Sequence, residues 1–156
     1  MVVMPKVNIN TDISEGMCFG CGRNNPIGLK LKFRREGDKV TALFTSQEQH
    51  QGWQGVVHGG IIAAVIDEAM GYATHFAGMN CLTARMEIKL KSPAPVGETF
   101  TVSSFIEKSS RKLVTVKADM SLPDGTLVAE GKATFFIIEH SSHVAEQHER
   151  GHADND

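Results

Sequence analysis

The sequence predicts an α+β domain in which an antiparallel sheet of about six strands is wrapped around one long central helix. Residues 60–76 supply the helix, because they form one long apolar stretch of mostly helix-forming residue types. Residues 29–44 and 82–137 supply the strands, because apolar and polar residues alternate there with the period of a one-sided sheet. Both kinds of element must bury an apolar face, which favours one shared core.

The helix is predicted from its length as much as from its propensity. After Gly60 the chain continues IIAAVIDEAMGYATHF, where the isoleucines and valine are weaker helix formers than their neighbours. Apolar residues occupy nearly every side of this segment, which is typical of a helix surrounded by other elements. We therefore expect it to be the buried axis of the domain.

The strands are predicted in chain order. Alternation over residues 29–33 resumes over 40–44 after Glu36-Gly-Asp38, which indicates a hairpin. Pro123-Asp-Gly125 is a strong signal for a tight turn between two long antiparallel strands. The remaining strands are expected over residues 82–90, 100–106, 114–120 and 127–137.

Length and composition limit the function classes. A chain of 156 residues has the usual size of one domain, and we expect a leader over 1–28, a folded domain over 29–139 and a frayed tail over 140–156. A net charge of −2 argues against a nucleic-acid partner. The sequence shows no signal peptide or membrane span, and its three cysteines are an odd number, so a cytoplasmic protein is expected.

Asp67 is the first candidate for chemistry, because an unpaired carboxylate in the middle of an apolar helix is costly to bury. The structural alternative is that Asp67 only pairs with a nearby Lys, Arg or His. Glu68 lies about 100° further around the helix axis, so one pocket is expected to hold only one of the two carboxyls. We favour Asp67, and expect Glu68 to be solvated or paired at an interface.

His58-Gly59-Gly60 is the second candidate. Glycines allow another molecule to approach closely, and the free N–H groups of a helix start point at incoming negative charge. Such donors can stabilise the oxyanion of an acyl-transfer intermediate. An ordinary loop entering a helix is the structural alternative, but the combination of His58, two glycines and Asp67 nine residues after the histidine favours a site.

These residues also carry a family resemblance. The segment Gln51 to Gly71, QGWQGVVHGGIIAAVIDEAMG, resembles the signature of PaaI-like hotdog-fold acyl-CoA thioesterases, and the likeness continues over residues 82–88, 93–97 and 124–133. The resemblance implies a hotdog fold, a homodimer at minimum with a homotetramer as the alternative, and hydrolysis of acyl-CoA thioesters without a cofactor.

The resemblance also implies roles for single residues. Asp67 matches the catalytic acid, acting as general base or nucleophile, and the backbone N–H of Gly60 matches the oxyanion donor, with Gly59 adjacent. His58 matches a histidine that orients the thioester carbonyl. Thr83 matches a Ser or Thr that positions the hydrolytic water.

Two features depart from that pattern. Gly52 stands where many PaaI-like members have an asparagine, which leaves the carbonyl to backbone groups or to Gln51 or Gln54. Alternation from Leu82 to Leu90 places Thr83 on the face opposite the apolar residues. Thr83 therefore reaches the site only at a subunit interface or at a bulge, and ranks below Asp67.

Cys18 and Cys21 have the CxxC spacing of a zinc knuckle half. A complete site needs two more ligands, and Cys81 is the only other cysteine, so no metal is expected. Relatives with similar CxxCG leaders imply an ordered N-terminal segment near the site.

The loop Lys108-Ser-Ser-Arg-Lys112 is expected to contact substrate through Ser110, Arg111 and Lys112, because the resemblance places the nucleotide of CoA near this loop. A solvated basic turn is the alternative.

Geometry adds one expectation. Gly60 and Asp67 are seven residues apart on one helix, or roughly 10 Å, too far for both to act on one carbonyl. We therefore expect a site built from two subunits, in which the two-fold contact joins one helix start to the other acid. The alternatives to hydrolysis are a non-catalytic acyl-CoA-binding protein and a dehydratase of 3-hydroxyacyl thioesters, although a His-Phe-Pro-type segment is absent.

Overall fold

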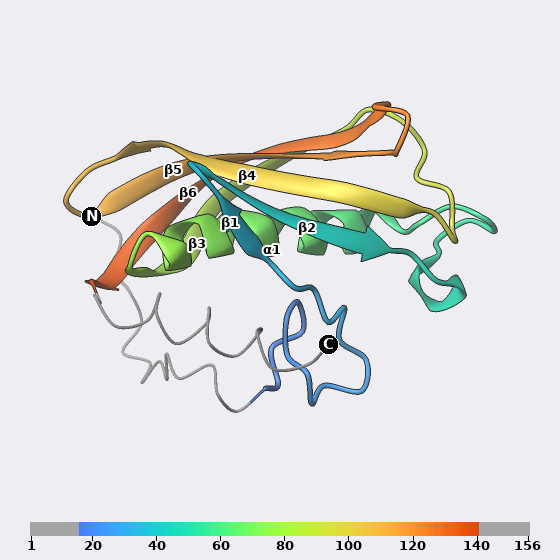
Figure 1. The fold of residues 1–156 in the computed structure, drawn as a ribbon, viewed down its shortest axis with the longest axis horizontal. Coiled ribbons are helices and arrows are strands. Elements are labelled where there is room, and N and C mark those ends of the chain that lie inside the picture. Colours follow the sequence, from blue (N-terminus) through green and yellow to red (C-terminus); the bar gives the residue numbers. More distant parts are fainter. Residues whose placement is uncertain (1–15, 141–156) are drawn as a thin grey trace.

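A computed structural model describes residues 16–140 as six antiparallel strands and one long helix (Figure 1). The sheet order is β1-β2-β4-β5-β6-β3, which confirms the α+β prediction. The elements are β1 Arg34–Glu36, β2 Lys39–Thr45, the 3-10 helix η2 Glu48–His50, α1 Gly59–Phe76, β3 Met79–Leu90, β4 Thr99–Ser109, β5 Leu113–Ser121 and β6 Leu127–His140. Among these elements, no helix is long and apolar enough to cross a membrane.

The core lies between α1 and one face of the sheet, which the helix crosses in Figure 1. Val65, Ile66, Ala69 and Met70 are fully buried, as the spacing of an apolar helix face requires. The inner faces of β4, β5 and β6 supply their partners, among them Phe100, Val102, Val114, Val116, Met120 and Val128. Burial of these side chains is the main stabilising term for the domain.

One flank of α1 is covered by the N-terminal segment rather than by a strand. The ring of Phe33 stacks on that of Tyr72 with centroids 4.5 Å apart, and Leu31 is buried in the same core. The backbone N–H of Leu31 donates to the carbonyl of Gly20, which joins the two ends of this N-terminal segment. The prediction of a hairpin strand over residues 29–33 is therefore wrong in position, and the paired strand is β1.

Lys30 explains that shift. Its φ of 52° is left-handed, so the extended run that the alternation suggested is broken at this residue. The alternation still predicted burial correctly, since Leu31 and Phe33 are inside while Lys30 and Lys32 are exposed. An extended segment with alternating burial but no sheet hydrogen bonds gives the same sequence pattern as a paired strand.

Strand β3 is an edge strand that pairs with β6 and contains a bulge at Ala84. Before the bulge, Thr83 faces α1; after it, Ile88 and Leu90 do. The single apolar face expected over residues 82–90 is therefore interrupted. The extra residue shifts the alternation by one position, as β-bulges do.

The predicted domain limits are only partly covered. Residues 1–15 of the expected leader and 141–156 of the expected tail lie outside the described residues. Residues 16–33 form turns and irregular segments that precede β1.

Candidate active site

Asp67 lies in the middle of α1 and is half-buried against β3. The hydroxyl of Thr83 donates a hydrogen bond to Asp67 Oδ1 at 2.9 Å. Simple alternation would have turned Thr83 to the opposite face of β3, and the bulge at Ala84 brings it to the helix side. The two residues are therefore brought together within one chain.

The environment of Asp67 favours the protonated carboxyl more than water does. Burial raises the pKa of Asp67, the nearby Cys18 thiol adds to the increase, and the hydrogen bond from Thr83 opposes it. The ion pairs found within residues 16–140 do not include Asp67. A carboxylate with a hydroxyl partner and no cation is typical of a general base or nucleophile rather than of a structural salt bridge.

The start of α1 is capped by His58, whose Nδ1 accepts a hydrogen bond from the N–H of Gly60 at 2.8 Å. The expected oxyanion donor is therefore already bonded within its own chain. For the neighbouring N–H of Gly59, the described part of the chain provides no acceptor. As the first residue of the helix, Gly59 directs this N–H away from the helix, where an incoming oxyanion can accept it.

The two candidate glutamines lie in the loop before α1. Gln51 Oε1 accepts a hydrogen bond from the N–H of Gly55 at 3.1 Å, so this side chain closes the loop. Gln54 is exposed. Gln54 is thus the glutamine whose amide is available to a ligand.

The loop between β4 and β5 lies at the other end of the sheet from the start of α1 (Figure 1). Ser110 Oγ donates to the carbonyl of Leu113 and accepts from its N–H, which closes the turn. Arg111 and Lys112 are exposed. Within one chain, the predicted site residues therefore form three groups: Asp67 with Thr83, the helix start with the loop before it, and the loop between β4 and β5.

Sequence reasoning missed the partners of Glu68. The thiol of Cys18 donates to Glu68 Oε1 at 3.5 Å, and Cys21 lies in the same cluster. A hydrogen bond from Cys21 lowers the pKa of the Cys18 thiol to about 5, and the same bond, with burial, raises the pKa of Cys21. Burial raises the pKa of Glu68 to about 7. Cys18 and Glu68 are 50 positions apart, and no local pattern links them.

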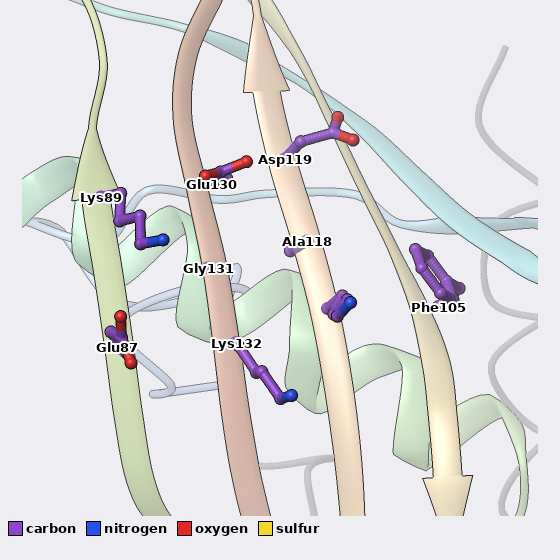
Figure 2. Close-up of a pocket in the computed structure, with 9 residues that line it drawn as sticks. Glu87, Lys89, Phe105, Ala118, Asp119, Glu130, Gly131 and Lys132 are labelled. Atoms are coloured by element: carbon purple, nitrogen blue, oxygen red, sulfur yellow. The ribbon is translucent and has the colours of Figure 1, made fainter.

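A separate hollow of about 320 Å³ lies on the outer face of the sheet, with the strands between it and α1 (Figure 2). Charged side chains of both signs line it, including Glu87, Lys89, Asp119, Glu130 and Lys132. None of the predicted site residues contributes to this hollow. Lys132 also pairs with Glu107 at 3.3 Å, which is typical of a solvated sheet face.

Fold and site together define a hotdog domain with an acid in the middle of its helix. The model of the thioesterase superfamily matches residues 54–129, a span that includes His58, Asp67 and Thr83. This match agrees with the hotdog thioesterase resemblance of the sequence.

Curated relatives carry consistent names. The chain is 28% identical over 138 residues to acyl-coenzyme A thioesterase THEM4 of Bos taurus, covering 86% of this chain and 57% of the relative. It is 28% identical over 100 residues to acyl-coenzyme A thioesterase 13 of Mus musculus, covering 62% and 71%. The chain spans about half the length of the THEM4 relatives that it matches.

Solved structures share the fold. Zebrafish thioesterase superfamily member 2 is 25% identical with a TM-score of 0.64, over 69% of this chain and 81% of that chain. The PaaI protein of E. coli is 17% identical with a TM-score of 0.68, over 72% and 83%. A hypothetical thioesterase protein from Streptococcus pneumoniae, solved with coenzyme A, is 16% identical with a TM-score of 0.68, over 72% of this chain and 91% of that chain.

Proposed function

We propose that this protein hydrolyses acyl-CoA-type thioesters to a free acid and CoA. The observation that carries the proposal is the 2.9 Å contact between Thr83 and Asp67, a hydroxyl and a cation-free carboxyl on the edge-strand side of α1. The match to the thioesterase superfamily model and relatives named acyl-coenzyme A thioesterases support it. The S. pneumoniae structure with coenzyme A supports the choice of substrate class.

In the proposed reaction, Asp67 takes a proton from water as the water oxygen attacks the thioester carbonyl, or attacks that carbonyl itself. The carbonyl oxygen gains negative charge, and the helix-start N–H of Gly59 stabilises it, with His58 and Gly60 shaping the cap. The C–S bond then breaks and CoA leaves as its thiol. In the general-base route Asp67 returns the proton that it took from water; in the nucleophilic route the proton comes from solvent, and water then hydrolyses the acyl-Asp67 anhydride to release the acid and restore the carboxylate. Thr83 holds the carboxyl in position.

The same spacing of acid and hydroxyl occurs in a structural neighbour. Two further structures of the S. pneumoniae thioesterase carry alanine in place of an aspartate and of a threonine sixteen positions apart. Asp67 and Thr83 have that separation. The pair is therefore the first target for mutation here.

We further propose that each site is shared between two subunits. Gly59 and Asp67 are eight residues apart on α1, or roughly 12 Å, which is too far for both to act on one carbonyl in the same chain. Strand β3 offers a contact surface, because its outer edge is unpaired within the described sheet and Met86 and Leu90 are exposed on it.

A specific strand register satisfies this requirement. Thr83 contacts Asp67, and a Cβ atom on Gly59 would lie 3.2 Å from Leu90 Cδ1. Antiparallel pairing of two β3 edges with Thr83 opposite the partner subunit's Leu90 would therefore bring Asp67 towards the helix start of the partner. Both side chains face α1 in this register, as directly opposed residues of an antiparallel pair must.

The hydrolysis proposal is tested by measuring free thiol release from a panel of acyl-CoA substrates of different chain length and aromaticity. We expect turnover of at least one class, with Ser110, Arg111, Lys112 and Gln54 contributing to CoA affinity. Saturable binding of acyl-CoA without any thiol release would instead identify a non-catalytic binding protein. Formation of an unsaturated acyl-CoA from a 3-hydroxyacyl-CoA would identify a dehydratase.

The shared site is tested by mixing Asp67→Asn chains with Gly59→Pro chains. Proline at the first helical position removes the donor N–H with little cost to the helix, and His58, at φ −60° and ψ 135°, already has the conformation required before proline. Each parent should be inactive, and the mixture should regain about one competent site per heterodimer. Gly59→Ala is the matched control, because it keeps the N–H and adds a Cβ. Inactive heterodimers, verified by differential tags, would place the site within one chain.

Finally, we propose a cytoplasmic location. The chain has three cysteines, an odd number that argues against a disulfide framework and supports a reducing compartment. Fractionation of cells that produce the full-length protein, with thiol labelling of Cys81 before lysis, tests this.

A further inference from the structure

A second cluster of reactive side chains lies on another side of α1 from Thr83. Cys18 Sγ, Cys21 Sγ and one oxygen of Glu68 are all within 4.8 Å of one another. The proposed hydrolysis uses none of them. Cys18 is exposed, whereas Cys21 and Glu68 are half-buried, so the cluster is open to solvent on the side of Cys18.

The backbone around the two cysteines has the form of a metal-binding knuckle. The N–H of Gly22 donates to the Cys18 carbonyl at 2.8 Å, which closes a turn over residues 18–22, and the backbone of Gly20 and Cys21 lowers the pKa of the Cys18 thiol. A lowered pKa favours the thiolate, which is the form that binds metal. The turn thus holds both sulfurs on the side that faces Glu68.

Two glycines are required by close approach. A Cβ on Gly22 would lie 2.4 Å from the carbonyl oxygen of Gly16 and 2.5 Å from Cys18 N. A Cβ on Gly20 would lie 2.4 Å from the carboxyl carbon of Glu68. The turn is therefore packed directly against the carboxyl at Gly20, whereas Gly22 lets the turn close on its own backbone.

Glu68 lacks a conventional counter-charge. The ion pairs among residues 16–140 leave it out, and the groups around it include the two thiols, Asp67 and Tyr72. A carboxyl enclosed by two thiols and another acid is a poor arrangement for ionised groups unless a cation joins them. This charge pattern is independent of the knuckle geometry and supports the same conclusion.

We propose that Cys18, Cys21 and Glu68 bind one Zn²⁺ ion, with water as the fourth ligand of a tetrahedral site. Tetrahedral zinc with bonds of about 2.3 Å to sulfur and about 2.1 Å to oxygen places its ligands about 3.5–3.8 Å apart. Cys18 Sγ and Glu68 Oε1 are already 3.5 Å apart. Closing the remaining contacts within the 4.8 Å cluster needs movements of about 1 Å. Two thiolates and a carboxylate suit zinc better than magnesium or calcium, which prefer oxygen.

The balance of charge follows from the ligands. Binding releases the protons of any thiol or carboxyl that is protonated, and two thiolates with one carboxylate reduce the charge of Zn²⁺ to a net −1. The ion would join the N-terminal segment to α1 at the residue next to Asp67. Its expected role is to hold this segment in place, and the proposal does not depend on thioester hydrolysis.

The test is metal binding by the purified full-length protein, reduced with a phosphine and kept free of oxygen. We expect one Zn²⁺ per chain by elemental analysis, and a Co²⁺ derivative with sulfur-to-cobalt charge-transfer absorption in the near ultraviolet. That absorption separates thiolate ligation from binding by His143, His148 or His152, which lie outside the described residues. Cys18→Ser and Cys21→Ser should each abolish it.

Two further variants make the test specific. Cys81→Ser should retain the absorption, because Cys81 is not in the cluster. Glu68→Gln should weaken zinc affinity by at least about tenfold, since loss of even an outer-shell partner costs about 10–100-fold. Fully reduced wild-type protein that gives no charge-transfer absorption, or that gives it equally in Cys18→Ser, would overturn the proposal. A stable Cys18–Cys21 disulfide that forms in place of metal binding, under the same reducing conditions, would do the same.

Discussion

Asp67 and Glu68 are adjacent in the sequence but have opposite kinds of surroundings. Asp67 faces an edge strand, has a hydroxyl partner and lies beside a surface suited to a second subunit. Glu68 faces two thiols and the backbone of a tight turn. Because neighbouring helical residues point about 100° apart, two adjacent carboxyls on one helix can face two different sets of side chains. The comparison teaches that a pair of acids in a sequence need not form one site.

The largest expected effect separates the two acids by activity. Asp67→Asn should lower thioester hydrolysis by about a hundredfold or more, because it removes the general base or nucleophile. Glu68→Gln should lower it by far less. Free thiol release is the measurement, with circular dichroism and gel filtration as checks on fold and assembly. Equal losses in both variants would mean that the carboxyls act as one site after all.

The next effect concerns the packing of the Glu68 side. Gly20→Ala should lower the free energy of unfolding by about 1–3 kcal/mol, because the new Cβ overlaps the Glu68 carboxyl. Gly71→Ala is the matched control within α1, where a Cβ meets nothing within 4 Å. That variant should be more stable than wild type by up to about 1 kcal/mol, since alanine is the better helix former. Urea unfolding measures both, and a Gly20→Ala protein as stable as wild type would contradict the close approach.

The third effect concerns the Asp67 side. Thr83→Ala should reduce hydrolysis by about tenfold or more, because a hydrogen bond to a charged group contributes about 1.5–3 kcal/mol. Thr83→Ser should restore most of the rate, since it keeps the hydroxyl. Zinc content should be the same in both variants. If Thr83→Ser is as impaired as Thr83→Ala, the hydroxyl is not what positions the carboxyl.

The smallest effect is expected from metal removal. Dialysis against a chelator should leave most of the hydrolysis in place, because the proposed ligands do not contact the thioester. Unfolding should nevertheless begin at a lower temperature, since an ion that binds only the folded state stabilises it. Thermal melts before and after zinc is restored provide the measurement. Complete loss of turnover on chelation, regained with zinc, would show that the two sides of α1 are not separate.

The sequence was informative where local pattern determines structure. The apolar run of α1 and the alternating runs of the strands predicted the fold, since burial alone requires those periods. Asp67 could be chosen as a candidate because a charge stands out in an apolar helix. These features need no knowledge of distant contacts.

The remainder depended on contacts between distant segments or on irregular backbone. The bulge at Ala84 turns Thr83 towards Asp67. It cannot be predicted from the sequence, because the alternation of apolar and polar residues continues unbroken from 82 to 90. The left-handed conformation of Lys30, which interrupts the expected first strand, cannot be predicted from that pattern either. The approach of Cys18 to Glu68 joins segments 50 positions apart, so the CxxC spacing gave no sign of the carboxyl beside it.

The bulge in β3 has a consequence for how such a site could arise or be lost. The side chains of a strand point alternately to the two faces of the sheet. One added residue reverses the faces for all residues on one side of the insertion without changing their identity. If Ala84 were deleted, Ile88 and Leu90 would still face the helix, but Thr83 would point to the outer face of the sheet. Asp67 would then lose its hydroxyl partner while the core kept every contact after the deletion. The pairing of acid and hydroxyl thus depends on a residue that has no functional group of its own.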